Sequence, residues 1–412
     1  MARKDFIITG LDIGTSFVRA AIAKCSPENG IEIIGASVKP SMGMKKSVIV
    51  NKNDMTELVR ATVESAEHDA GIEVDTLHVG IGGGHINCCT TAAVVNNLDA
   101  DDTIKEKHIT KLIENARNNS AERGREAIHE ITQEYRLDGH CVEGSPVRSA
   151  GSRIEARVHM ITADRTILEN HGRVINDAGF RIAGMCWNVV ADGLAILSEK
   201  EKKDGVLLID IGGGSTEYAV YFNNTIQHSN VFAVGGEHIT NDLMIGLNIR
   251  EDEAEDIKKT YVIKSRSNDD SNSDIIQIGM QGQRKKPLSK ADVEMIIESR
   301  VDELIQFIKN DVMEKCCLAL IGSGIVFVGG STYLHHFKEK AKNCFGKPVR
   351  IATPLLNMPD VSASELNIYS DRHEFLRDPS CATILGLLKS GYNLKIAEMK
   401  KSIGFFDKIF RH

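Results

Sequence analysis

The stretch Val206–Phe222, VLLIDIGGGSTEYAVYF, predicts a strand, a glycine-rich turn and a second strand. An apolar run leads into Asp210, a triple glycine follows, and a second apolar run ends at Phe222. Glycines let backbone N–H groups approach and point at an anion, so a phosphate would fit this turn. Asp210 could hold Mg²⁺ beside it through water. Taken alone, the same glycines can equally reflect turn geometry.

The N-terminal stretch Phe6–Ile22, FIITGLDIGTSFVRAAI, repeats this pattern. An apolar run leads into Asp12, a short Gly-Thr-Ser turn follows, and a second apolar run returns. Both turns lead into a strand, whereas the glycines of a Walker or Rossmann loop lead into a helix. Those two nucleotide-binding classes are therefore excluded, and the repeat favours a phosphate site built from two hairpins.

Length and composition limit the class of protein. The 412 residues suggest two to four domains, and 42% hydrophobic residues are enough to build cores. A net charge of −7 argues against nucleic acid as an electrostatic partner. Nine scattered cysteines without CxxC spacing indicate neither a zinc site nor a disulfide framework, and fit a reducing cytoplasm. We expect neither a signal peptide nor a membrane-spanning helix.

The remaining elements follow from periodicity and from turn residues. Helices are expected over 54–70, 104–125, 165–178, 187–198, 250–261, 333–341 and 382–388, near Thr240, and in a long helix capped by Ser289. Strands are expected over 31–38, 47–50, 76–81, 86–95, 130–137, 153–162, 275–280 and 325–331.

Two of the segments between these elements have a distinct character. A third glycine run, Gly82–Gly84, has no aspartate before it, so a domain crossover is favoured over another phosphate loop. It precedes residues 85–163, which suit an inserted unit of two helices and a small sheet. Farther along, Gly235-Gly236 precedes the helix near Thr240, whose N–H groups could also face a phosphate.

The last segment, Lys400–His412, predicts an amphipathic helix with a basic polar face. Its apolar and basic side chains favour a membrane surface or a partner groove over docking on the chain's own domain. The membrane-facing candidates are Ile403, Phe405, Phe406, Ile409, Phe410, Lys400, Lys401 and Lys408.

Together these motifs resemble the actin/Hsp70/sugar-kinase superfamily and, within it, the bacterial FtsA family. Asp12–Ser16 and Leu207–Tyr221 resemble the two phosphate motifs, and Ile325–Ser331 resembles the adenosine motif. The segments that resemble FtsA more specifically are QEYRLDG (133–139), RIEARVHMIT (153–162), GGEHITNDL (235–243), AEDIK (254–258), VRIATP (349–354), ATILGLLKSG (382–391) and the tail.

The resemblance implies an α/β, actin-like (ribonuclease H-like) fold of two lobes that clamp ATP and Mg²⁺. Asp12 and Asp210 would flank the metal. The phosphates would be bound by Gly14, Thr15, Ser16, Gly212, Gly213, Gly214, Ser215 and Thr216. Glu255 and Lys258 would reach ribose or adenine, and Gly235, Gly236, Gly329, Gly330 and Ser331 would line the nucleotide.

Two positions depart from the family pattern. Phe17 stands where the family usually has lysine after Gly-Thr-Ser, so one positive charge is missing. Asn188-Val189 stands where relatives carry Glu-Pro, a glutamate that helps to position the attacking water. Asparagine can orient water but is a very poor base. Asn188 therefore joins Asp12 and Asp210 as a catalytic candidate, with slow or absent ATP hydrolysis expected.

The family's role implies a protein that tethers FtsZ to the cytoplasmic membrane at the division septum, forms filaments and recruits later division proteins. The FtsZ C-terminal tail would dock on Arg250–Arg300. The expected subdomains are 1A (1–84, 164–199 and 370–391), 1C (85–163), 2A (200–245 and 311–369), 2B (246–310), and a linker with the amphipathic helix (392–412).

Two alternatives remain from the sequence. A small-molecule kinase or phosphatase of the same superfamily would need a catalytic carboxylate, but its candidates Glu217 and Asp192 are better explained as hairpin and helix surface. A pilus-assembly relative would lack the phenylalanine-rich tail, and a shape-determining relative would lack the insert.

Overall fold

The computed structural model describes residues 5–96, 103–267, 275–278, 286–315, 317–334, 337–354, 361–363 and 375–409. Over 260–267, 275–278, 286, 361–363 and 401–409 it describes the backbone only.

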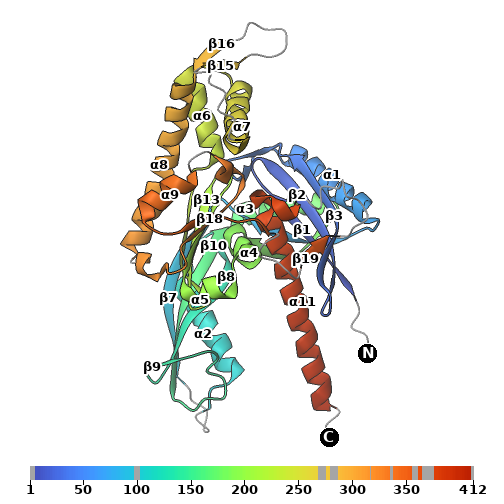
Figure 1. The fold of residues 1–412 in the computed structure, drawn as a ribbon. Coiled ribbons are helices and arrows are strands. Elements are labelled where there is room, and N and C mark those ends of the chain that lie inside the picture. The colour runs from blue at the N-terminus through green and yellow to red at the C-terminus, as the bar shows by residue number, and fades with distance from the viewer. Residues whose placement is uncertain are drawn as a thin grey trace.

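Two sheets of the same plan form the two lobes (Figure 1). The first sheet has the order β11-β6-β1-β2-β3-β19 and the second has the order β14-β13-β12-β17-β18. In each, an antiparallel trio (β1-β2-β3 or β12-β13-β14) continues into two parallel strands. The repeated hairpin of the sequence therefore belongs to a repeated lobe.

The strands of the first sheet are β1 (Phe6–Ile13), β2 (Phe17–Ser26), β3 (Gly30–Pro40), β6 (Thr76–Ile81), β11 (Arg181–Trp187) and β19 (Val361–Ala363). Those of the second sheet are β12 (Val206–Ile211), β13 (Thr216–Phe222), β14 (Thr225–Phe232), β17 (Ile325–Val328) and β18 (Val349–Ile351). Strands β11, β14, β18 and β19 were not predicted.

Two helices, α4 (Asn188–Ile196) and α11 (Ala382–Ile409), pack between the sheets and join both lobes into one core. Along β12, Val206 and Leu208 face this shared core while Leu207 and Ile209 face the core of the second lobe. Because both faces of β12 are buried, its sequence is a continuous apolar run rather than an alternating one.

The remaining helices cover the outer faces. On the first lobe these are α1 (Lys52–Ala70) and α3 (Arg165–Asp177). On the second they are α6 (Gly236–Leu247), α7 (Glu251–Ser267), α8 (Lys290–Glu314) and α9 (Phe337–Phe345). Ser289 caps α8 as predicted, since its hydroxyl accepts from the N–H of Asp292 at 3.4 Å. The short elements are β4 (Met44–Lys45), β5 (Val48–Ile49), β15 (Ile275–Ile278), β16 (Lys286–Ser289) and α5 (Glu199–Asp204).

The segment predicted to be inserted forms its own sheet, in the order β7-β10-β8-β9, with helix α2 and a separate core. Its elements are β7 (Asn87–Asn96), α2 (Glu106–Asn119), β8 (Arg125–Leu137), β9 (His140–Val142) and β10 (Arg153–Asp164). The structure describes one helix within 103–163 rather than the two expected. Gly82–Gly84 is the crossover into this unit, as predicted.

The C-terminal helix differs from the predicted pair of short helix and separate tail. Helix α11 runs without a break from Ala382 to Ile409, and its last turns extend away from the body of the molecule (Figure 1). Side chains become exposed after Gly391, and Leu394 is 54% exposed. The same helix therefore begins in the core between the lobes and ends as the tail.

The close approach of α11 to α4 predicts a large effect at one glycine. A Cβ at Gly386 would lie 1.9 Å from the carbonyl oxygen of Ala191, so Gly386→Ala is expected to lower the free energy of unfolding by about 3 kcal/mol. Gly172→Ala is the control, because a Cβ at that α3 position meets nothing within 4 Å. Urea denaturation measures both, and equal stabilities of the two variants would contradict the packing described.

Candidate functional site

The two predicted phosphate turns lie against each other at the meeting point of the lobes. Each is closed by the same hydrogen bond, from Gly14 N to Phe17 O and from Gly212 N to Ser215 O, both at 3.0 Å. A Cβ at Gly213 would lie 2.4 Å from the Ser16 hydroxyl. Only glycine allows the two backbones to come this close.

Each turn follows a pair of facing side chains in its hairpin. Asp12 lies opposite Arg19 in β1–β2, and Asp210 lies opposite Glu217 in β12–β13. Side chains directly opposite in an antiparallel pair share one face of the sheet. The two halves of the site are therefore matched in position, but the aspartate faces the Arg19 guanidinium in the first half and the Glu217 carboxyl in the second.

Arg19 is a site residue that the sequence analysis missed. Its guanidinium lies 3.4 Å from the Asp12 carboxylate, donates to the Ser380 hydroxyl at 2.9 Å, and stacks over the Phe17 ring at 5.3 Å. The side chain is 11% exposed. The positive charge missing at Phe17 is thus supplied two residues farther along the same strand. Strand alternation, which puts residues 17 and 19 on one face, was the available signal.

Four buried carboxyl groups lie near one another at this site, two of them close to Arg19, and burial raises the pKa of each. The pKa of Asp12 is raised by burial and partly restored by Arg19. Burial, with the nearby charge of Asp12, raises the pKa of Asp210 to about 7. Burial, with the charge of Asp210, raises the pKa of Glu217 to about 8. Burial, with the nearby charge of Asp210, raises the pKa of Asp192 well above its usual range.

The assignment of Glu217 and Asp192 to the surface was wrong. Asp192 is 0% exposed and accepts from the Thr383 hydroxyl at 2.8 Å, and Glu217 is 2% exposed and accepts from the N–H of Gly83 at 2.6 Å. Both lie on elements covered on two sides, α4 between the sheets and β13 within one.

Asn188 stands at the first residue of α4, beside Glu217. A Cβ at Gly82 would lie 2.5 Å from both the Asn188 amide nitrogen and a Glu217 carboxyl oxygen. Among the described atoms, the side-chain amide oxygen (Oδ1) of Asn188 is buried without a hydrogen-bond partner. A carboxyl with a pKa near 8 is mostly protonated at neutral pH, so little of Glu217 is ionised and able to accept a proton there. Slow hydrolysis stays a prediction.

The residues predicted to line the nucleoside converge on the second turn. The Ser331 hydroxyl donates to Gly212 O at 3.3 Å, and a Cβ at Gly329 would lie 2.3 Å from Asp210. A Cβ at Gly330 would meet only Ser380, at 3.8 Å. The η2 turn, Gly330–Tyr333, carries Ser331 directly after β17.

Helix α6, together with Glu255 and Lys258 of helix α7, brings the other half of this lining. Lys258 pairs with Glu255 at 2.7 Å and donates to Gly236 O at 3.2 Å, while Thr240 donates to Glu255 at 2.8 Å. The helix begins at Gly236, earlier than the predicted Thr240. The first N–H groups of α6 were predicted to face a phosphate, but those of Gly236 and Glu237 donate to the carbonyls of Gly212 and Gly213 at 3.0 and 2.8 Å.

These residues fit a nucleotide with a bound cation. Gly213 and Gly214 leave room where the turns meet, and Thr216 is fully buried and anchors the second turn through Val234 O at 2.8 Å. Arg19 lies beside Asp12 and near Asp210. Asp12 and Asp210, the two carboxyls predicted to flank a metal, both lie at this junction. Within the described part of the chain no group of three metal-ligating side chains is found, so a cation here would depend on water or phosphate oxygens for its other ligands.

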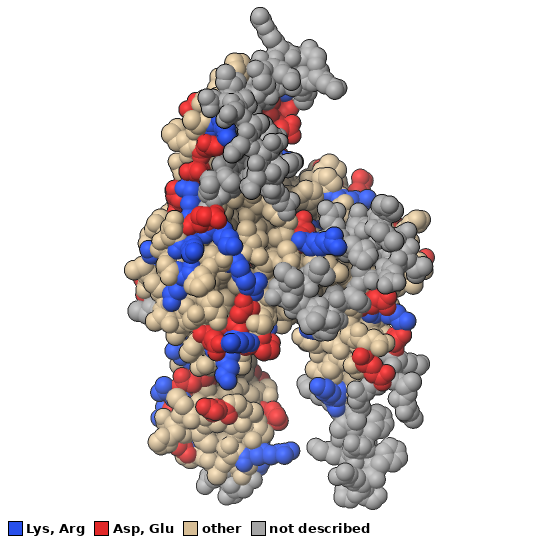
Figure 2. All heavy atoms as spheres, in the orientation of Figure 1, with Lys and Arg blue, Asp and Glu red and all other residues tan. Residues whose placement is uncertain are grey.

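The predicted membrane-facing residues lie at the far end of α11. The backbone is helical through Ile409, as predicted, Lys400 is exposed, and Phe410 lies outside the described residues. The face drawn in Figure 2 mixes acidic and basic side chains over both lobes. No helix in the described ranges is long and apolar enough to cross a bilayer.

Comparison with known proteins agrees with the fold and with the predicted insert. The family model "Cell division protein FtsA" matches residues 207–386, and the model "SHS2 domain inserted in FTSA" matches 83–162. The cell division protein FtsA of Neisseria meningitidis is 30% identical over 396 residues, covering 96% of this chain and 92% of that protein. That of Bacillus subtilis is 31% identical over 350 residues, covering 84% and 79%.

Solved structures share the fold at low sequence identity. A PilM-PilN type IV pilus biogenesis complex matches with a TM-score of 0.68 and 14% identity, covering 93% of this chain and 98% of that chain. MreB5 of Spiroplasma citri bound to ADP matches with a TM-score of 0.52 and 14% identity, covering 97% and 98%.

The matched lobes, with a carboxylate-bearing turn in each, define an actin-like protein. The family within this class is identified by the match to the FtsA model, by the SHS2 insert and by the FtsA relatives that are matched over most of their length. The chain belongs to the FtsA family of cell-division proteins.

Proposed function

We propose that the protein binds ATP with Mg²⁺ between its lobes and uses the bound state to set its conformation. The observation that carries this proposal is the convergence of two Asp-Gly turns, one from each lobe, beside Arg19. Asp12 and Asp210 would hold the cation, which would screen phosphate charge. The remaining backbone N–H groups of both turns would bind the phosphates, and Lys258 with Glu255 would position the nucleoside.

The second part of the proposal is that the protein tethers FtsZ to the cytoplasmic membrane at the division septum. Helix α11 supports it, because one continuous helix connects the interlobe core with the basic, phenylalanine-rich end. A single short amphipathic helix binds lipid weakly, so self-assembly into filaments would supply avidity. FtsZ and later division proteins would be the partners.

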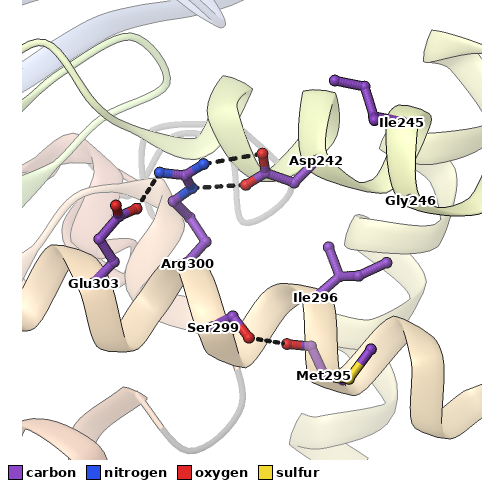
Figure 3. Close-up of a pocket in the computed structure, with 8 residues that line it drawn as sticks. All are labelled: Asp242, Ile245, Gly246, Met295, Ile296, Ser299, Arg300 and Glu303. Atoms are coloured by element: carbon purple, nitrogen blue, oxygen red, sulfur yellow. Dashed lines mark hydrogen bonds and ion pairs between the residues drawn. The ribbon is translucent and has the colours of Figure 1, made fainter.

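A groove between α6 and α8 is the candidate site for the FtsZ tail (Figure 3). Ile245 and Met295 on its sides are 73% and 61% exposed. Arg300 lies at one end, where it pairs with Asp242 at 2.6 Å and with Glu303. An extended peptide with apolar side chains would match the exposed Ile245 and Met295. The groove extends the predicted Arg250–Arg300 region onto α6.

Substitutions in the tail test the membrane role. Phe406→Glu with Phe410→Glu is expected to abolish co-sedimentation with anionic liposomes, because two carboxylates replace apolar anchors on the predicted lipid-facing side. Leu394→Glu is the matched control, since Leu394 is an exposed apolar residue on the same helix before the tail. Unchanged sedimentation of the double variant would exclude the tail as the membrane anchor.

Substitution in the groove tests the FtsZ role separately. Ile245→Glu is expected to lower recruitment of FtsZ to liposomes by about tenfold while leaving the protein's own liposome binding intact, since the loss of one buried anchor costs roughly 1–3 kcal/mol. Glu169→Gln, on the exposed face of α3, serves as the control. Full recruitment by the Ile245 variant would place the FtsZ tail elsewhere.

A further inference from the structure

The hairpin of β4 and β5 carries an unusual two-residue turn, Lys46-Ser47. The strands pair through Met44–Ile49 and Lys45–Val48, so residues 46 and 47 alone form the connection. Both have positive φ, 48° and 61°. Such turns favour Asn-Gly, because a side chain with positive φ costs conformational energy. The structure shows surroundings that can hold such a turn at Ser47, which is buried, whereas Lys46 is exposed.

Ser47 is held by both phosphate turns at once. Its N–H donates to the Thr15 hydroxyl at 3.1 Å, and its own hydroxyl lies 3.3 Å from that of Thr15 and 3.4 Å from that of Ser215. Thr15 belongs to the first lobe and Ser215 to the second. The Ser47 hydroxyl is thus the middle member of a chain of three hydroxyls that crosses between the lobes.

Two glycines from neighbouring segments pack closely against Ser47. A Cβ at Gly214 would lie 2.9 Å from both the nitrogen and the hydroxyl of Ser47, and a Cβ at Gly83 would lie 2.5 Å from the Ser47 Cβ. Ser47 is 8% exposed. Glycines from two other segments therefore make room for this one side chain.

We propose that Ser47 is a specificity-determining residue that distinguishes a nucleoside triphosphate from a diphosphate. The inference rests on the proposed nucleotide site. The three hydroxyls bond to one another where the two phosphate turns meet, and each can instead donate to a phosphate oxygen. A terminal phosphate at this junction would be bound by all three, whereas a diphosphate would leave the hydroxyl chain as it stands.

The mechanism also links the nucleotide to the lobes. A hydroxyl that donates to phosphate no longer donates to its neighbour, so the terminal phosphate would replace Ser47 as the group joining Thr15 and Ser215. The strained turn would then be released from one of its contacts. Binding of a triphosphate would therefore change the contacts of the β4–β5 hairpin as well as those of the two turns.

The test is equilibrium binding of Mg-ATP and Mg-ADP to the full chain by calorimetry. Ser47→Gly removes the hydroxyl and relaxes the turn, and Ser47→Ala removes the hydroxyl while keeping a side chain at positive φ. Both are expected to lower ATP affinity roughly tenfold, the value of one charge-assisted hydrogen bond, and to leave ADP affinity within about twofold. Ser41→Ala, a buried hydroxyl with no partner among the described atoms, is the control.

Each other outcome overturns the inference. Unchanged ATP affinity in both variants, or an equal loss for ATP and ADP, would show that the Ser47 hydroxyl does not discriminate. A loss confined to Ser47→Ala would assign the effect to turn strain. Wild-type protein that binds neither nucleotide would overturn the proposed nucleotide site, and this inference with it.

Discussion

Replacing Arg19 by methionine is expected to lower the free energy of unfolding by about 3–5 kcal/mol, since removing one partner leaves the other charge buried without compensation. The Arg19 and Asp12 side chains are 11% and 8% exposed, and Arg19 also lowers the pKa of nearby Asp210 against the effect of burial. Methionine keeps much of the side-chain volume, so the drop in unfolding free energy would come from the lost charge rather than from lost packing. Urea denaturation without nucleotide measures it.

An exposed ion pair of the same type provides the control for Arg19. Arg181 and Asp75 form a pair whose side chains are 73% and 72% exposed, and Arg181→Met should cost less than about 1 kcal/mol. Adding Asp12→Asn to the Arg19 variant should restore much of the lost stability. If Arg19→Met were as mild as Arg181→Met, the buried pair would not stabilise the site.

Replacing Glu217 by glutamine is expected to stabilise the protein increasingly as the pH rises from 5 to 7.5. Burial raises the pKa of Glu217 from 4.5 to about 8, so the folded state keeps a proton that the unfolded state releases in this interval. The unfolding free energy of the wild type therefore falls with rising pH, by about 1.4 kcal/mol per pH unit from this group. Glutamine has no proton to release.

The difference in unfolding free energy between Glu217→Gln and wild type is the quantity to follow, without nucleotide or Mg²⁺. It should grow through pH 5–7.5 and level off above pH 8, where Glu217 is ionised in both states. Glu169→Gln, at an exposed position, should show no such trend. A difference independent of pH would mean that Glu217 is ionised in the folded protein throughout.

Local pattern was enough to predict the two hairpins, the insert and the turn residues, because each depends on residues close together in sequence. It failed for Glu217 and Asp192. Charge suggests a surface, and only the tertiary structure shows that β13 and α4 are covered on both sides. It also gave no signal for Ser47, whose proposed role depends on Thr15 and Ser215 approaching from separate lobes.

Helix α11 shows a different limit of the sequence. Its first turns are apolar and its last turns are amphipathic and basic, so periodicity suggested two elements with a linker. The backbone nevertheless continues through Gly391, since one glycine weakens a helix by only about 1 kcal/mol relative to alanine. The continuity matters because it places the tail and the interlobe core on one element.

Titration of the protein with Mg-ATP most directly tests the claim that two Asp-Gly turns form one nucleotide site. We expect saturable binding to the wild type, weakened at least about tenfold in both Asp12→Asn and Asp210→Asn, because each variant removes one of the two carboxylates available to the cation. No saturable binding to the wild type, or full affinity in both variants, would contradict the account.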